Sequence, residues 1–342
     1  MKSLAVHGPP AFYGGEIGRR FVDGLRGAGC PLAIEDLVEH RADLVSPMRA
    51  RYRDLDVSVV PPNSQGYVLL QILTMIDRLQ LNPDPFGPDA GALALTMRAA
   101  ATDRDRHLAD ADRMRVHPSD LLEDGHIAAL CDEVRAGFVE PPRAPAARGG
   151  GDTIGLVTAD SSGFAVSLIQ SLYEGFGSGI LEPDTGIVAH NRGACFSVQP
   201  GHPNELVPGA RPAHTLMPVL VQRDGRAAYV SGTMGGHAQA QINAMILTRA
   251  IDLGATPAEA VAAPRWLSAG REPEEREPFV ALEADVPQAT AQALRGAGFS
   301  VDPLGRLDSS VGHAHMIRVG LEGPGRLEAG SDPRADGGAL AS

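Results

Sequence analysis

The stretch GDTIGLVTADSSGFAVSLIQS, residues 151–171, combines two runs of strand-forming residues with the turn between them. Aliphatic and β-branched residues dominate 154–159 and 164–169, and both runs have the length of typical strands. Residues 160–163, Asp-Ser-Ser-Gly, are turn formers, so the sequence predicts a β-hairpin. The preceding segment, 140–152, is rich in Pro, Arg, Ala and Gly without an apolar pattern, which predicts a linker.

Thr153 stands at the junction between this linker and the first strand, directly after Asp152. If the bond between Asp152 and Thr153 were broken, Thr153 would carry both a hydroxyl and a free α-amine. The ordinary pKa of an α-amine, about 7.7 to 8, lies near working pH, so the amine could act as the base for the hydroxyl beside it. An ordinary strand threonine after a linker accounts for the same spacing, and spacing alone does not separate the two interpretations.

The rest of the chain is predicted to mix helices and strands. Apolar residues at helical spacing predict helices over 12–26, from 34 onward, and over 67–79, 91–109, 119–135, 239–253, 257–262 and 286–297. Strands are predicted over 52–60, 216–222, 227–231 and 315–319, the second and third joined by a turn at 223–226. The charged run 103–106, Asp-Arg-Asp-Arg, is interpreted as the exposed, solvated end of its helix.

Length and composition restrict the class of protein. The 342 residues allow two average domains or one large α/β domain, and 43% hydrophobic with 21% charged residues is an ordinary globular composition. With 40 Gly and 27 Pro, the chain holds more turn formers than a helix bundle tolerates. A net charge of −12 repels phosphate backbones and anionic headgroups, so neither nucleic acid nor membrane partners are expected.

Cysteine usage and the N-terminus indicate the compartment. Cys30, Cys131 and Cys195 are odd in number and lack metal-ligand spacing, so we interpret them as buried thiols rather than disulfides or a zinc site. No run of about 18 apolar residues occurs, and residues 1–15 lack the apolar region of a signal peptide. Taken at face value, the chain is predicted to be cytoplasmic.

Several familiar functional motifs are missing from the sequence. It holds no Walker A sequence, nucleophile elbow or HExxH motif, and GFGSG at 175–179 lacks the spacing of a dinucleotide loop. His313 and His315 would point to one face of a strand, but no carboxylate or cysteine lies in register with them. We interpret them as solvated or hydrogen-bonded histidines, and no metal site is predicted.

Residues 151–241 resemble the small subunit of the γ-glutamyltranspeptidase family. Further motifs resemble the same family in order along the chain: GPPAFYGGEI at 8–17, PPNSQG at 61–66, DRDR at 103–106, APRW at 263–266 and SDPR at 331–334. The first three resemble the later part of the family's large subunit. The resemblance therefore covers almost the whole chain.

This resemblance implies an N-terminal-nucleophile hydrolase with an α/β (α+β) fold, a four-layer αββα sandwich. Such a protein is made as a precursor that cleaves itself, here between Asp152 and Thr153. Residues 1–152 would be the C-terminal part of the large subunit and 153–342 the small subunit, interwoven in one domain. No metal or organic cofactor is implied, and the partners are a small acyl or amide substrate and the two fragments themselves.

The resemblance also implies roles for individual residues. Thr153 matches the nucleophile, and Ser171 matches the hydroxyl residue that supports it. Gly235 and Gly236 match the diglycine whose backbone N–H groups form the oxyanion hole. The implied reaction is hydrolysis or transfer of an acyl group, and glutathione metabolism is the family's usual setting.

Positions that match the γ-glutamyl pocket depart from the family's usual Asn, Gln, Asp and Ser-Ser. They are Tyr173, Arg192, Cys195, His214 and Thr215. The missing Asp would pair with a glutamyl ammonium, whereas Arg192 repels a cation and favours an anion. The pocket is therefore predicted to prefer an acyl group with a carboxylate and no ammonium, such as a glutaryl or oxalyl-like acid. The alternative is that Arg192 points outward and only offsets the acidic surface of a chain with a net charge of −12.

The sequence is also consistent with alternatives to a γ-glutamyl enzyme. The motifs also resemble a divergent bacterial branch that includes acylases and enzymes cleaving carbon–carbon bonds in antibiotic pathways. Family chains carry a long region, with an Arg that holds the substrate carboxylate, before the part matching residue 7. Its lack of a counterpart here predicts a truncated chain, a separately supplied half, or a non-catalytic remnant or binding subunit.

Overall fold

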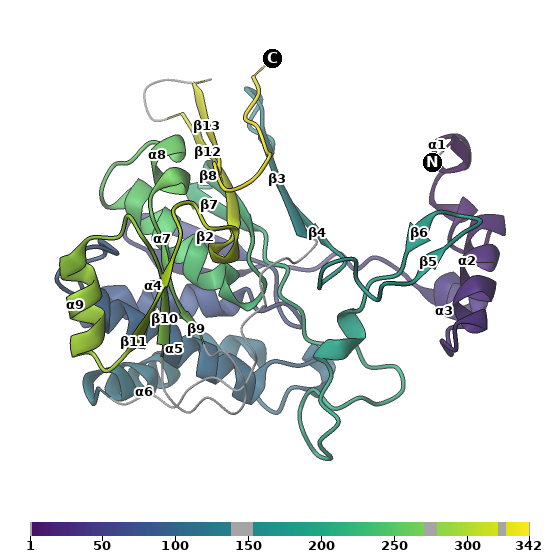
Figure 1. Cartoon of the computed structure of the whole chain (residues 1–342), viewed down its shortest axis with the longest axis horizontal. Helices are drawn as coiled ribbons and strands as arrows, with labels where there is room; N and C mark the ends of the chain where they lie inside the picture. Colours follow the sequence, from purple (N-terminus) through teal and green to yellow (C-terminus); the bar gives the residue numbers. More distant parts are fainter. Residues whose placement is uncertain (1, 138–152, 270–278, 321–325, 342) are drawn as a thin grey trace.

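The structure is a computed structural model that describes residues 2–137, 153–269, 279–320 and 326–341. At its centre lies a six-stranded sheet in which every neighbouring pair is antiparallel (Figure 1). The strands across the sheet are, in order, β1 (Met48–Tyr52), β2 (Leu55–Val59), β7 (Val219–Arg223), β8 (Arg226–Met234), β12 (His313–Val319) and β13 (Leu327–Ser331). Because β2 precedes residue 152 and β7 follows it, both sides of the predicted junction share one sheet.

Helices cover one face of this sheet and enclose the core. α4 (Tyr67–Leu79) contacts β1, α7 (Gln239–Ile251) contacts β8, and the two helices pack on each other. The helices packed on α4 and on one another beyond it are α5 (Ala90–His107), α6 (Asp124–Arg135) and α9 (Gln288–Gly296). Ala, Leu, Val, Ile and Met side chains dominate the core that these elements share. The low aromatic content of the sequence is thus compensated by aliphatic packing.

The predicted hairpin is confirmed and packs on the opposite face of the sheet (Figure 1). It consists of β3 (Thr153–Ala159) and β4 (Ala165–Ser171). Its closest approach is to β8, where a Cβ on Gly232 would lie 3.0 Å from Cδ1 of Ile169. Ser167 Oγ donates to the Ser231 carbonyl at 2.8 Å across the same contact. A glycine at 232 therefore allows the hairpin to lie directly on β8.

The outer face of the hairpin is apolar and exposed. Side chains alternate between the two faces along both strands, as strand geometry requires. The outward residues are Ile154, Leu156, Val166 and Leu168, with Phe164 of the preceding turn 77% exposed. Within the described residues, the hairpin is thus the only part of a second sheet layer, and its outer face is uncovered.

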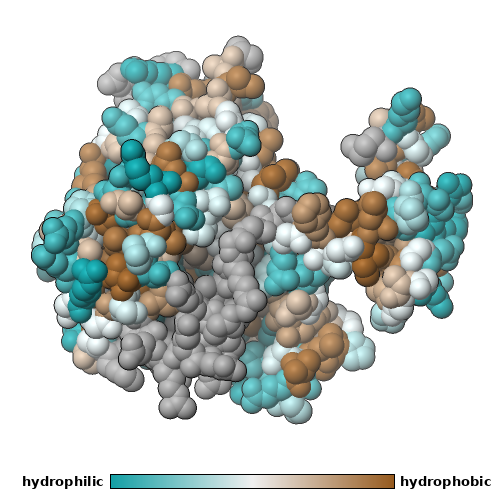
Figure 2. All heavy atoms as spheres, viewed as in Figure 1, coloured by the Kyte–Doolittle hydropathy of each residue, from teal (hydrophilic) through white to brown (hydrophobic). Residues whose placement is uncertain are grey.

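Three smaller units complete the fold. A lobe that stands apart from the main body is mostly hydrophilic on its outer side (Figure 2). It contains α1 (Lys2–His7), α2 (Glu16–Gly27) and α3 (Ile34–Glu39), with the strand pair β5 (Leu181–Glu182) and β6 (Ile187–Val188) beside α2. A three-stranded sheet is made of β9 (Trp266–Ala269), β10 (Phe279–Glu283) and β11 (Ser300–Leu304), and α8 (Pro257–Ala262) packs on β12 and β13.

Most predicted elements are present, with some different boundaries. The predicted strand over 52–60 corresponds to β2, whereas its first residue, Tyr52, ends the separate strand β1. The predicted helix over 119–135 is split at Glu123 into a 3₁₀ turn and α6. The prediction of buried thiols is confirmed for Cys131 and is wrong for Cys30 and Cys195, which are partly exposed. All three cysteines are free, without disulfide bonds. No helix in the described ranges is long and apolar enough to cross a membrane.

The interpretation of the charged run 103–106 as a solvated face is wrong for its first two residues. Asp103 is 2% exposed and Arg104 is 4% exposed. Asp103 accepts hydrogen bonds from Gln71 Nε2 at 2.7 Å and from His126 Nε2 at 3.0 Å. Since α5 is buried around nearly its whole circumference, the charges near its end are enclosed as well.

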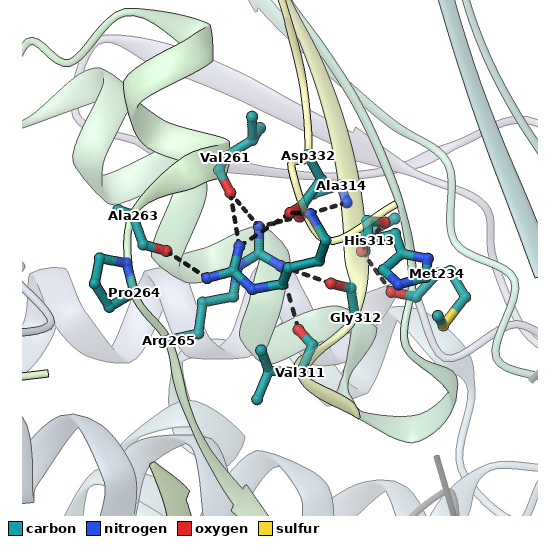
Figure 3. A network of polar contacts seen from close by, with 12 residues as sticks. Met234, Val261, Ala263, Pro264, Arg265, Val311, Gly312, His313, Ala314 and Asp332 are labelled. Atoms are coloured by element: carbon teal, nitrogen blue, oxygen red, sulfur yellow. Dashed lines mark hydrogen bonds and ion pairs between the residues drawn. The ribbon is translucent and has the colours of Figure 1, made fainter. Parts of the chain in front are cut away.

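A network of buried charges joins the segments that follow α8 and β13 (Figure 3). Arg265 of the APRW motif donates to Asp332 Oδ2 of the SDPR motif at 2.5 Å, and both side chains are fully buried. Arg334 donates to Asp332 Oδ1 at 3.0 Å and to Glu283 Oε1 at 2.8 Å. Burial lowers the pKa of Arg265, whereas for Arg334 the hydrogen bond to Glu283 and the charge of Asp332 outweigh burial and raise the pKa.

Replacing Asp332 with Asn should destabilise the fold strongly. The substitution leaves two buried guanidinium groups without their shared carboxylate, and breaking a buried pair costs about 3–5 kcal/mol. Urea unfolding of the two proteins measures this loss. Asp285→Asn removes a partner of Arg306 in an exposed pair and should cost at most about 1 kcal/mol. Equal losses in the two variants would contradict the assignment of Asp332 as a central structural carboxylate.

Candidate functional site

Thr153 and Ser171 form a pair of hydroxyls on the sheet-facing side of the hairpin. They lie directly opposite each other in the antiparallel register, and their Oγ atoms are 2.7 Å apart. Ser171 Oγ also accepts the backbone N–H of Tyr173 at 2.8 Å. Because that bond occupies a lone pair of Ser171, its own proton remains available to the Thr153 oxygen. Asp152, the residue before Thr153, lies outside the described residues.

Gly235 and Gly236 follow directly from β8, the strand on which the hairpin packs. Their φ angles are +156° and +53°, and a Cβ on Gly235 would lie 2.4 Å from Cδ1 of Ile242. The carbonyl of Met234 accepts from Thr233 Oγ1 at 2.6 Å, and that of Gly235 accepts from the N–H of Ala238 at 3.0 Å. Since the N–H and C=O of a peptide are antiparallel in one plane, these bonds fix the directions of both glycine N–H groups.

The five predicted pocket residues also come together. Arg192, in the 3₁₀ turn Arg192–Cys195, lies over the Tyr173 ring with 4.0 Å from its guanidinium carbon to the ring centroid. Its Nη1 contacts Thr215 Oγ1 at 3.3 Å and Cys195 Sγ at 3.6 Å. Burial, and to a smaller extent a hydrogen bond with Cys195, raises the pKa of the Tyr173 hydroxyl. No carboxylate in the described ranges forms an ion pair with Arg192, so its charge is not neutralised by the groups that it contacts there.

The histidines around this cluster are held neutral. Burial, aided by the charge of Arg192, lowers the pKa of His214 to about 4, and its Nδ1 accepts the N–H of Leu216 at 3.2 Å. Burial is the main cause that lowers the pKa of His237 to about 3, and the positive charge of Arg104 lowers it further. At neutral pH both rings are uncharged, so the positive charge near the pocket comes from arginines.

A cavity of about 500 Å³ lies against these groups. Of the predicted residues, Tyr173, Cys195, His214 and Thr215 line it. The residues that line it and that the sequence did not indicate include Gln65, Arg104, Asn204 and His237. Its size is that of a small-molecule site.

Arg104 and Gln65 were the clearest omissions from the predicted site. The DRDR run was interpreted as solvated because mixed charge at a helix end usually is. The signal that could have found it is the composition of α5, which presents Ala and Leu on every side and so has no polar face to meet water. A helix with that pattern is buried, and a charge near its end is then enclosed.

Metal binding has no support in the part of the chain that the structure describes. No group of three His, Cys, Asp or Glu side chains there is placed to hold an ion. The pKa values of His313 and His315 are both lowered, chiefly by burial. Both rings are therefore partly buried, neutral groups.

Comparison with known proteins places the chain. A family model described as gamma-glutamyltranspeptidase matches residues 1–342. The chain belongs to this family. It is 35% identical over 342 residues to the glutathione hydrolase-like YwrD proenzyme of Bacillus subtilis, an alignment that covers 99% of this chain and 64% of that relative. It is also 34% identical to the oxamate amidohydrolase proenzyme of Klebsiella pneumoniae, covering 99% and 63%.

A solved structure gives the same assignment. The cephalosporin acylase of Bacillus halodurans superposes with a TM-score of 0.87 at 31% identity, over 98% of this chain and 60% of that one. The predicted γ-glutamyltranspeptidase resemblance and the N-terminal-nucleophile hydrolase fold are thus confirmed. The chain spans somewhat less than two thirds of the length of these relatives. The roles of the individual site residues stay predictions.

The lowered pKa of His214 should make stability depend on pH. Unfolding raises its pKa from about 4 to the ordinary 6.5, so the unfolded chain takes up a proton between these values. Stability should therefore fall as the pH drops from about 6.5 to 4, by up to about 1.4 kcal/mol per pH unit from this residue. Urea unfolding at pH 7 and pH 5 measures the slope.

His214→Asn keeps an acceptor for Leu216 and should reduce that slope. The matched control is His117→Asn, since the exposed His117 accepts the N–H of Ser119 through Nδ1 in the same local arrangement. The control should leave the slope unchanged. An unchanged slope in His214→Asn would show that His214 does not titrate as its burial requires.

Proposed function

We propose that this protein is a self-processing amide hydrolase in which Thr153 is both the cleavage point and the nucleophile. The observation that carries the proposal is the 2.7 Å contact between the Thr153 and Ser171 hydroxyls at the first residue of β3. Membership of a family whose relatives are named as proenzymes supports it. A non-catalytic remnant is the alternative, and the hydroxyl pair, the pinned diglycine and the cavity favour an enzyme over it.

Maturation would begin with attack of Thr153 Oγ1 on the carbonyl carbon of Asp152. The Asp152–Thr153 amide bond breaks as the new ester bond forms, and the proton of the hydroxyl moves to the Thr153 nitrogen. Water then hydrolyses the ester, which leaves a carboxylate on Asp152 and restores the hydroxyl. The product carries a free α-amine next to its own nucleophile.

Turnover would use the same groups on an external amide. Thr153 Oγ1 attacks the acyl carbon while the α-amine accepts its proton, and the N–H groups of Gly235 and Gly236 stabilise the oxyanion. The proton passes to the leaving amine as the amide bond breaks and an acyl ester remains on Thr153. Water, or an acceptor amine, then releases the acyl group and regenerates the hydroxyl.

The two products of self-cleavage, residues 1–152 and 153–342, would stay together as one interwoven domain. The β2–β7 pairing, with Val57 opposite Val221, supports this because it joins the two products in one sheet. The exposed apolar outer face of the hairpin fits a sandwich in which another layer packs on that face. We therefore expect residues 1–152 to act as the later part of the large subunit and 153–342 as the small subunit.

For the substrate, we propose an amide whose acyl part carries a carboxylate and no ammonium. Arg192 supports this because, among the residues that the structure describes, its guanidinium contacts the neutral groups of Tyr173, Cys195 and Thr215 and no carboxylate. A relative named as an oxamate amidohydrolase supports it too, since oxamate is the monoamide of a dicarboxylic acid. An acylase is the second candidate, favoured by the cephalosporin acylase structure and by the cavity of about 500 Å³.

Thr153→Ala should abolish both self-cleavage and turnover, because one hydroxyl performs both attacks. Mass spectrometry of the purified chain shows whether fragments end at Asp152 and begin at residue 153. Thr158→Ala on the same strand, whose side chain lies on the exposed face, is the matched control and should be cleaved as the wild type is. Cleavage at 152/153 in Thr153→Ala would disprove the shared nucleophile, and an intact wild-type chain would support the remnant.

Ser171→Ala should be milder than Thr153→Ala, since it removes a supporting hydrogen bond that contributes about 0.5–1.5 kcal/mol. Turnover should fall by about tenfold and self-cleavage should slow. Ser167→Ala, which removes a hydroxyl from the same face of β4 without touching Thr153, should change turnover little. A loss as complete as that of Thr153→Ala would mean that the two hydroxyl roles are reversed.

Arg192→Gln should shift substrate preference towards the γ-glutamyl group. The wild type is expected to show a higher kcat/KM for a glutaryl anilide than for a γ-glutamyl anilide, because Arg192 attracts the carboxylate and repels the ammonium. Kinetics with both anilides measure the ratio. Arg211→Gln removes an exposed arginine that pairs with Asp43 and controls for the change in net charge. Equal ratios in the wild type and Arg192→Gln would show that Arg192 does not select the substrate.

A further inference from the structure

Gln65 is a fully buried glutamine that joins three segments of the site. Its Nε2 donates to the Gly236 carbonyl at 2.9 Å and to the Thr215 carbonyl at 3.3 Å. Its Oε1 accepts from Arg104 Nη1 at 3.2 Å. The amide of Gln65 thus connects Arg104 near the end of α5, the diglycine turn at Gly236 and the pocket residue Thr215.

The backbone around Gln65 is held to the same pocket segment. The N–H of Gln65 donates to the His214 carbonyl at 3.0 Å, and the N–H of His214 donates to the Asn63 carbonyl at 2.9 Å. Ser64 Oγ donates to the Leu216 carbonyl at 2.6 Å. Residues 63–65 and 214–216 therefore lie side by side, and the Gln65 side chain starts from a fixed point.

The chemistry of its neighbours leaves one orientation for the Gln65 amide. Arginine has donors only, so the oxygen of Gln65 must face Arg104, and carbonyls accept only, so the nitrogen must face Gly236 and Thr215. Arg104 is fixed in turn because Nε and Nη2 bind Asp105 at 2.8 and 2.7 Å. Rotating the amide by 180° would break all three bonds of Gln65 at once.

The bond to Gly236 holds the peptide that directly follows the diglycine, between Gly236 and His237. The carbonyls of Met234 and Gly235 are held from within their own segment, by Thr233 and Ala238. The carbonyl of Gly236 also accepts the N–H of Gln239, again from its own segment, whereas Gln65 reaches it from 171 residues away in the sequence. Gln65 therefore ties a turn with two positive φ angles to the helical layer.

We propose that Gln65, oriented by Arg104, is a positioning residue that holds the diglycine in the geometry required to stabilise the oxyanion. The proposal rests on the proposed function and adds a residue that the predicted site did not contain. Gln65 touches no reacting atom, so its effect should reach the reaction through the N–H groups of Gly235 and Gly236. A turn free to move would bind the substrate nearly as well but the transition state less well.

The test compares Gln65→Leu and Gln65→Glu with the matched variant Gln241→Leu. Gln65→Glu keeps an acceptor for Arg104 but loses the donor to both carbonyls. Gln241 is also a buried glutamine whose Nε2 donates to a backbone carbonyl, that of Ser268, but it holds β9 rather than the diglycine. Each variant is made in the full chain. For each, we would measure kcat and KM with the glutaryl anilide and the extent of cleavage at 152/153.

For both Gln65 variants we expect kcat to fall about 10- to 100-fold with KM changed less than about threefold, because losing a whole oxyanion donor costs about 10²–10³ in kcat. Gln241→Leu should lose less than about threefold in kcat at a similar thermal stability. Equal kcat losses in Gln65→Leu and Gln241→Leu would overturn the proposal, as would a loss confined to KM. If Gln65→Leu fails to fold, Gln65→Glu carries the same comparison.

Wild-type behaviour separates this proposal from the one on which it rests. A wild type without cleavage or turnover refutes the proposed function itself. A wild type that cleaves and turns over, together with unaffected Gln65 variants, refutes only the positioning role of Gln65.

Discussion

The structure depends on the carboxylate of Asp332, which is fully buried between two guanidinium groups. A charge in that position is tolerated only when each lone pair finds a donor, and Asp332 has Arg265, Arg334 and two backbone N–H groups around it. Arg265 also donates to the Gly312 carbonyl at 2.8 Å. A Cβ on Gly312 would lie 2.4 Å from the Met234 carbonyl oxygen, so Gly312 packs directly against the start of the diglycine turn. By binding Gly312, the ion network helps to position the backbone that contacts this turn.

The Met234–Gly236 turn is therefore held from two directions by groups that the proposed reaction does not use. The ion network supports the Met234 side of the diglycine, and Gln65 with Arg104 supports its Gly236 side. Both supports draw residues from distant parts of the chain, and they add to the local hydrogen bonds that Thr233, Ala238 and Gln239 donate to the carbonyls of the turn. The hairpin adds a third element by placing the two hydroxyls on the face that meets β8.

Sequence patterns predicted the parts of this structure that rest on local periodicity. The hairpin, α4 and α8 are found where alternation or helical spacing placed them, and Thr153 and Ser171 pair as the family motif implied. The edge strands β1 and β13 were missed because Met-Arg-Ala-Arg-Tyr and Leu-Glu-Ala-Gly-Ser carry too little apolar pattern. Gln65 could not be predicted from local patterns, since the contacts that define it join residues 39 and 171 positions apart. For Arg104, the apolar composition of α5 was the only local indication of burial.

Arg104, which lines the cavity, and Arg192, which contacts the cavity-lining Tyr173, Cys195 and Thr215, illustrate why residue type alone does not assign a role. Arg104 is bound by the Asp105 carboxylate and the Gln65 amide oxygen, so its charge is compensated and its donors are directed into the protein. Arg192 rests on an aromatic ring, a hydroxyl and a thiol, none of which neutralises it. Since His214 and His237 are held neutral, the positive charge of this cluster lies on Arg192, which is consistent with its proposed role in binding an anionic group. A buried arginine with a carboxylate partner positions other groups, whereas one surrounded by neutral groups can select the charge of a ligand.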